Sequence, residues 1–248
     1  MTLPNSWNDI LVDQYIELRG LDDSLSYFDL MLETISIVTD TDIDELEELS
    51  FNELIEIEKQ LTWLTSEPSK NIKTVLDIPD YHGRAFIFKG FDDLKLGEFI
   101  DLNHFFSENF VDNLPTICAI LYRQTKKNEW NETIIEPYDY DPKNRIGLFM
   151  EVGITQVYGI IGSFLEYKSN FEQTYANLFK PDLSDEPVEE LDEETKKEIE
   201  EEERLDKFSW ERLIYSLTDG DITKTDKVLS LPVVYVFNVL SMKKALNI

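Results

Sequence analysis

The sequence predicts a mainly α-helical fold, a multi-helix assembly with one small β-hairpin as a minor α+β component. Apolar residues recur at the three- and four-residue spacing of a helix face through most of the 248 residues. Short apolar runs around a turn replace this spacing near residues 71–90. The chain is 42% hydrophobic, with 15 Phe, 11 Tyr and 4 Trp, so it carries enough apolar surface for a packed core.

Two helices are predicted in the first 40 residues. Apolar spacing predicts one over residues 7–18 and a second over 25–38, with Phe28, Leu32 and Val38 on one face of the second. The run of Thr and Asp at 39–42 is rich in capping residues and predicts a break after this helix.

A capping box marks the start of the next helix. Ser50 and Glu53 have the spacing at which each side chain bonds the backbone amide of the other, and Leu49 and Leu54 occupy the hydrophobic-staple positions. We expect this helix to continue to about residue 66, because Pro68 then stops it.

The hairpin follows this helix. Short extended runs at 72–78 and 85–88 flank a turn-rich stretch at 79–83, which predicts two antiparallel strands. A two-stranded hairpin is only marginally stable alone, so we expect helices to cover it.

Helical spacing returns after the hairpin. It predicts helices over 96–102 and 117–122, with Pro115 in the first turn of the second. Residues 126–145 are typical of a loop with a short extended piece at 133–135, and 146–179 predict two or three further helices.

A dense acidic segment divides the chain. Residues 182–206 contain 14 Asp and Glu but only 3 Lys and Arg, which predicts an acidic linker or a solvated helix. This segment separates a main helical body, 1–181, from a C-terminal helical unit, 207–248. In that unit we expect helices over 208–217 and 223–229 and a last one from Pro232.

The overall charge limits the kinds of partner. The formal net charge is -28, which repels nucleic-acid backbones and anionic membranes and suits a basic protein partner. We expect a cytoplasmic protein for three reasons. The chain has a single cysteine, its N-terminus does not resemble a signal peptide, and it has no apolar run long enough to span a membrane.

Residues that could carry catalysis are few. Cys118 could act as a nucleophile with His82 or His104 as its base, but it lies in an apolar helical run that predicts burial. Asp92-Asp93 and Asp139-Tyr140-Asp141 could bind a hard cation, but they lack the twelve-residue spacing of a calcium loop. We therefore predict no catalytic residue, no cofactor and no metal site.

Glycines give no phosphate-binding loop. Gly153, Gly159 and Gly162 do not match the spacing of a nucleotide-binding motif. Their helical spacing instead favours close packing against a neighbour, or a kink.

A family resemblance adds a more specific expectation. It rests on three groups of residues: Ser6–Leu18 with Leu61–Leu64, Lys95–Leu102 with Leu114–Leu121, and Trp210–Leu240. These resemble proteins from the structural-gene region of tailed phages that are described as tail-assembly-chaperone-like. The resemblance implies a non-enzymatic assembly role in the host cytoplasm, in which the chain binds a tape-measure, tail or other phage structural protein. The acidic insertion at 182–206 departs from that family.

Aromatic side chains on helices are the candidate contacts for such a partner, because helix-in-groove binding is anchored by large apolar groups. The candidates are Phe105, Phe106, Tyr167, Phe171, Tyr235 and Phe237. Each is also typical of a helix core.

Two other functions remain open at this stage. A structural component of the virion, in the tail, neck or portal region, has the same composition. An acidic DNA mimic that inhibits a DNA-binding enzyme would also explain the charge.

Overall fold

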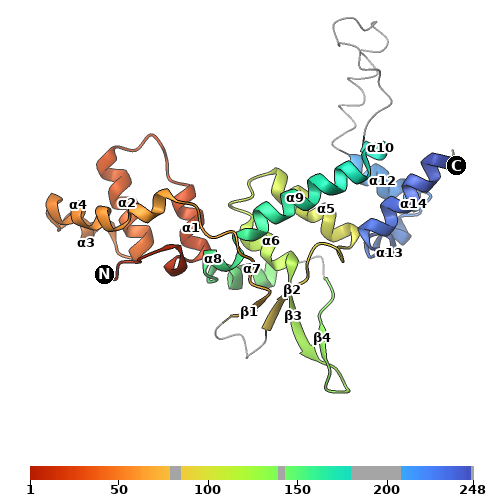
Figure 1. Cartoon of the computed structure of the whole chain (residues 1–248), viewed down its shortest axis with the longest axis horizontal. Coiled ribbons are helices and arrows are strands. Elements are labelled where there is room, and N and C mark those ends of the chain that lie inside the picture. The colour runs from red at the N-terminus through yellow and green to blue at the C-terminus, as the bar shows by residue number, and fades with distance from the viewer. Residues whose placement is uncertain (79–84, 139–142, 180–207, 247–248) are drawn as a thin grey trace, which may run out of the picture. The chain divides into compact units, whose positions relative to one another are not determined.

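The computed structural model of the chain is mainly helical, with a four-stranded antiparallel sheet, and so confirms the predicted fold class (Figure 1). The structure describes residues 1–78, 85–138, 143–179 and 208–246. The acidic segment 182–206 lies outside the described residues, and the predicted division into 1–181 and 207–248 stays a prediction.

The described chain forms two compact units. Unit 1 comprises Met1–Lys89 and His104–Leu165, and unit 2 comprises Gly90–Asn103 and Glu166–Ile248. Two helices, α5 (Leu96–Ser107) and α9 (Gly159–Thr174), contribute residues to both units.

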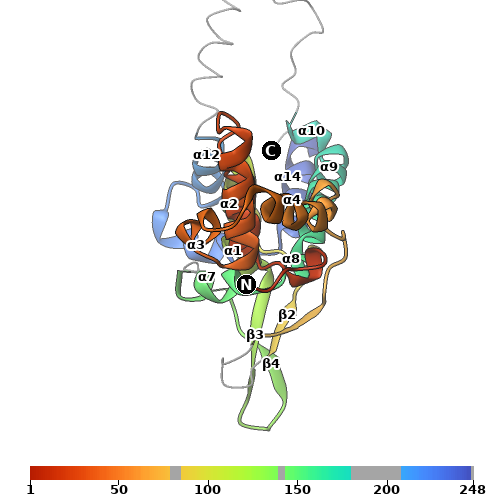
Figure 2. The same cartoon turned by 90° about the vertical axis from the view of Figure 1, so that its left-hand side faces the viewer.

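Unit 1 begins with a group of helices that pack on one another. Helix α2 contacts α1, α3 and α4, and Figure 2 shows these four helices nearest the viewer. With the two short 3-10 helices η1 and η2, their bounds are η1 Trp7–Asp9, α1 Val12–Arg19, α2 Tyr27–Thr39, α3 Ile43–Glu47, α4 Phe51–Gln60 and η2 Thr62–Thr65.

The capping box is confirmed at the start of α4. The Glu53 amide donates to Ser50 Oγ at 3.4 Å, and the Ser50 amide donates to Glu53 Oε2 at 2.8 Å. Leu54 is buried behind this cap. Helix α4 ends at Gln60, and η2 continues close to the predicted end at residue 66.

The continuous helix predicted over 7–18 is wrong. The chain is extended between η1 and α1, because the Val12 amide donates to Val152 O and the Ile154 amide donates to Ile10 O, each at 2.9 Å. These two bonds tie the segment to the residues around Gly153, a long-range pairing that local spacing does not reveal.

The sheet lies in unit 1 and has the order β1-β2-β3-β4. The predicted hairpin is confirmed as β1 (Val75–Asp77) and β2 (Ala85–Phe88), which pair antiparallel. Strand β3 (Tyr122–Lys127) pairs with β2 and with β4 (Thr133–Ile135), the predicted extended piece.

Tyr122 was predicted to be helical, and the structure corrects this. Helix α6 (Leu114–Leu121) ends one residue earlier, and Tyr122 pairs with Phe88 as the first residue of β3. The Tyr122 hydroxyl donates to Lys73 O at 2.6 Å, and the Arg123 guanidinium donates to Ala119 O at 3.1 Å, a carbonyl in the last turn of α6. The helix is thereby capped where the strand begins.

The remaining helices of unit 1 cover the predicted region 146–179 in part. They are α7 (Lys143–Met150), α8 (Ile154–Val157) and the first part of α9. The close packing predicted from the spacing of the glycines is found at Gly159, where a Cβ would lie 2.2 Å from Lys70 O. The close neighbour is therefore the backbone at 70–71, while Gly162 faces open space.

Unit 2 is built around aromatic side chains. Phe171 on α9 packs against Phe99 on α5 and Phe237 on α14, with ring centroids 4.8 Å apart in both pairs. The C-terminal helices match the predicted ones closely. The other elements of unit 2 are α10 Ala176–Phe179, α12 Ser209–Leu217, η4 Ile222–Lys224, α13 Thr225–Leu229 and α14 Val233–Leu246.

Candidate functional site

The most site-like feature of unit 1 is an apolar groove between α2 and the α4–η2 segment. It has a volume of about 320 Å³. We call it the α2–α4 groove. Its lining residues are Tyr27, Leu30, Met31, Thr34 and Ile35 from α2, and Glu58, Lys59, Leu61, Thr62, Leu64 and Thr65 from the opposite side.

The sequence of α2 produces this groove because it has more apolar residues than one helix face can bury. Met31 and Ile35 point into the core and form the buried base of the groove. Leu30 stays 36% exposed and Tyr27 58% exposed. A surplus of large apolar groups on a surface helix is typical of a binding surface.

Two interactions join α2 to α4. The Tyr27 hydroxyl donates to Glu58 Oε2 at 2.5 Å, and this hydrogen bond raises the pKa of Tyr27. The rings of Phe28 on α2 and Phe51 on α4, which do not line the groove, stack with centroids 6.4 Å apart. Phe28 is exposed although Leu32 and Val38 of the same predicted face are buried.

The surroundings of the groove are strongly acidic. Residues 1–69 contain 17 Asp and Glu but only two basic residues, Arg19 and Lys59. Both cations are already paired: Lys59 with Glu56 at 2.6 Å and Arg19 with Glu67 at 3.0 Å. The carboxylates around the groove therefore far outnumber the neighbouring positive charges.

A second, polar groove of about 1010 Å³ runs beside α1, α2 and α3. Seven carboxylates line it, and in the part of the chain that the structure describes no Lys or Arg side chain does. Within the described ranges, no group of three or more His, Cys, Asp or Glu is placed to hold a metal ion. The seven acidic residues are Asp9, Asp13, Glu17, Glu33, Asp40, Asp42 and Glu45.

In the described part of the chain, no hydrogen bond or ion pair joins the residues that were considered for catalysis. Cys118 is buried as predicted, and burial raises the pKa of its thiol. A thiol in such surroundings is a poor nucleophile, because the thiolate is the reactive form. His104 is exposed and lies 3.4 Å from Glu108, whereas His82 and the pair Asp139 and Asp141 lie outside the described residues.

Of the candidate contacts, Phe105 and Phe106 belong to unit 1 and are half-buried. Phe106 stacks on Phe164 with centroids 4.4 Å apart, and Phe105 lies beside His104. Phe106 is therefore largely engaged in packing within its own unit.

The other four candidates belong to unit 2. Phe171 and Phe237 are buried in its aromatic core. Tyr167 is half-buried on Phe91, and burial together with the charge of Asp92 raises the pKa of Tyr167 to about 12. Tyr235, at 57% exposed, is the one of the four that a partner could reach without rearrangement.

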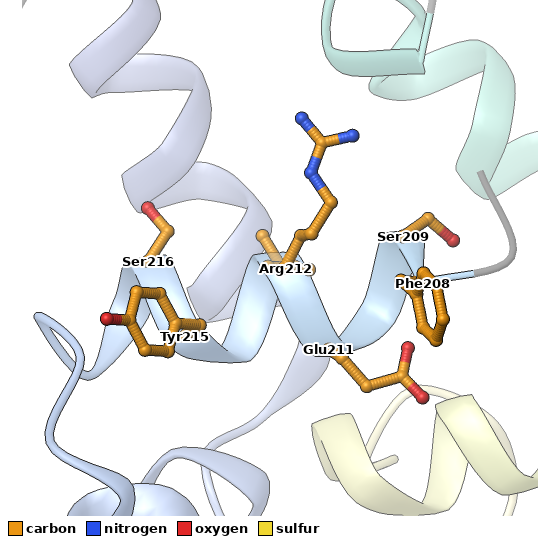
Figure 3. A pocket seen from close by; sticks show the side chains of 7 residues that line it. Phe208, Ser209, Glu211, Arg212, Tyr215 and Ser216 are labelled. Atoms are coloured by element: carbon orange, nitrogen blue, oxygen red, sulfur yellow. The ribbon is translucent and has the colours of Figure 1, made fainter. Parts of the chain in front are cut away.

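Unit 2 also has a pocket of about 740 Å³ on α12 (Figure 3). Its lining runs from Phe208 to Ser216, and Arg212 points away from Glu211 in the figure. Every lining residue belongs to α12 or directly precedes it. In the described chain, the pocket is therefore bounded on one side only.

The groove residues Tyr27, Leu30 and Leu64 were not among the predicted contacts. The available signal was the apolar run of α2, which exceeds the number of residues that one face of a helix can bury. Local spacing does not show where α4 lies, so the opposite side of the groove could not be inferred.

No protein-family model, curated protein or solved structure matches this chain. Within the described part, no helix is long and apolar enough to cross a membrane.

Proposed function

We propose that this chain is a non-enzymatic binding protein that holds an apolar segment of another protein in the α2–α4 groove. The observation that supports this role is the groove itself, with a buried base and exposed Tyr27 and Leu30 at its edge. Grooves between helices commonly accept apolar side chains of a partner helix.

The setting that we propose is phage assembly. The resemblance of Ser6–Leu18, Lys95–Leu102 and Trp210–Leu240 to tail-assembly-chaperone-like proteins suggests a tape-measure, tail or other phage structural protein as the partner. An assembly chaperone needs a surface that covers apolar groups and later releases them. The α2–α4 groove lies at the surface with Tyr27 and Leu30 exposed at its edge, so a partner can reach it and leave it.

The test compares partner capture by three forms of the full chain. These are the wild type, Leu30→Lys, which puts a charge in the groove, and Leu165→Lys, the same change at a 49% exposed site on α9 outside the groove. We expect the wild type and Leu165→Lys, tagged and purified from producing cells, to retain one structural protein that aggregates when expressed alone. Leu30→Lys should lose it. Equal capture by all three forms would count against the groove as the binding site.

A second function is favoured by the polar groove. Its seven carboxylates could imitate the phosphates of DNA against a basic enzyme. DNA mimicry predicts tight inhibition of a nuclease that high salt removes and that Asp40→Asn with Asp42→Asn weakens. Unchanged nuclease activity at low salt would exclude this function for the enzyme tested.

A further inference from the structure

The shape of the α2–α4 groove indicates what kind of segment fits it. Met31, Ile35 and Leu61 form its buried base, and Leu30 and Leu64 line it at a more exposed level. An apolar strip between two helical segments matches the side chains that a third helix presents at three- and four-residue spacing. A helix that lies there has one face toward the groove and the opposite face toward solvent.

The charge around the groove selects among such helices. Residues 1–69 hold 17 carboxylates against Arg19 and Lys59, and both cations are engaged with glutamates. A partner helix with acidic flanks would be repelled, and one with basic flanks would be attracted from beyond contact distance. Outside the acidic segment 182–206, the rest of the sequence has no comparable excess, since residues 70–181 contain 12 basic and 16 acidic residues and 207–248 contain 6 basic and 4 acidic residues.

We infer that the α2–α4 groove binds an amphipathic helix of the partner whose apolar face enters the groove and whose polar face is rich in Lys and Arg. This inference rests on the proposed function and adds the chemistry of the segment that is held. The apolar contacts supply most of the affinity. The carboxylates of the N-terminal helices increase the association rate and exclude acidic helices.

Four synthetic peptides of about five helical turns test the inference on the full chain. Three share one leucine face and have Lys, Gln or Glu on the polar face. The fourth has the composition of the Lys peptide in an order that leaves no apolar face. Binding is measured by fluorescence anisotropy at salt concentrations from about 50 mM to about 500 mM.

We expect the Lys peptide to bind about tenfold or more tightly than the Glu peptide at low salt, and salt to reduce this difference. Leu30→Lys should weaken binding of the Lys peptide by about tenfold, because its charge meets the apolar face of the peptide. Leu165→Lys changes the net charge equally and should bind like the wild type. Circular dichroism verifies that both variants are folded.

Two contrary results have different meanings. If the Gln or Glu peptide binds as tightly as the Lys peptide and Leu30→Lys still weakens binding about tenfold, the groove is a docking site but the basic partner is wrong. If the reordered peptide binds as well as the Lys peptide, or if Leu30→Lys has no effect, the groove is not the site. That second result overturns both this inference and the proposed function.

Discussion

Two glycines at the start of α9 have opposite surroundings. A Cβ at Gly159 would lie 2.2 Å from the backbone oxygen of Lys70, whereas a Cβ at Gly162 would meet nothing within 4 Å. We expect Gly159→Ala to lower the free energy of unfolding by about 2 kcal/mol or more, because backbone atoms have to shift. Gly162→Ala should raise it by up to about 1 kcal/mol through better helix propensity. Urea unfolding of both variants measures the difference, and equal effects would contradict the close approach at Gly159.

A second prediction at the scale of single residues concerns Glu67. It accepts a hydrogen bond from the Tyr158 hydroxyl and pairs with Arg19, and these bonds hold its pKa below the usual 4.5. A carboxyl group with a lowered pKa stabilises the fold above pH 4.5, and this contribution is lost as the pH falls through the folded-state pKa. Tyr158→Phe removes the largest cause of the shift.

We therefore expect the unfolding free energy of Tyr158→Phe to fall less steeply below pH 4.5 than that of the wild type. Chemical unfolding over a series of acidic buffers measures this slope. Tyr235→Phe, which alters an exposed phenol, is the control and should follow the wild type. Identical slopes for Tyr158→Phe and the wild type would show that the hydrogen bond from Tyr158 does not lower the pKa of Glu67.

At the scale of elements, α4 depends on its capping box, and α4 forms one side of the groove. Ser50→Ala removes the side-chain acceptor for the Glu53 amide, so the variant should be less stable by about 1 kcal/mol. Ser69→Ala, at an exposed position outside any helix, should leave stability unchanged. Thermal and urea unfolding check both variants. A loss with Ser69→Ala as large as that with Ser50→Ala would argue against a specific cap.

Elements with a complete local signal were predicted well. The capping box at Ser50 and the hairpin around 79–83 can be recognised from the sequence, because each depends on residues only a few positions apart. Strand β3 lacked such a signal. Its sequence from Tyr122 to Lys127 is charged and follows α6 without glycine or proline, so only the pairing with β2 and β4 makes it a strand.

The candidate site was harder to predict than the fold for the same reason. The predicted contacts Phe171 and Phe237 are large and apolar, but in the structure they fill the core of unit 2. Tyr27 and Leu30 also have large, mainly apolar side chains, yet they remain exposed. Which aromatic residues are covered depends on how helices pack, and spacing along one helix does not contain that information.

At the scale of the molecule, the negative charge is concentrated rather than uniform. Residues 1–69 have a net charge of -15, from 17 acidic and 2 basic residues, and 182–206 have a net charge of -11, from 14 and 3. Nearly all of the total of -28 therefore lies in these two stretches. Concentrating like charges costs stability through repulsion, and the proposed basic partner helix would relieve this repulsion on binding.

The last prediction separates an assembly chaperone from a structural virion component. A chaperone has to leave its partner after assembly, whereas a structural component stays bound in the finished particle. The proposed role in phage assembly predicts that quantitative mass spectrometry finds the chain in infected cells but not in purified particles. A major tail protein from the same particles provides the reference for copy number. A fixed number of copies per particle would instead assign the chain to the virion, and the α2–α4 groove would then be a lasting contact between structural subunits.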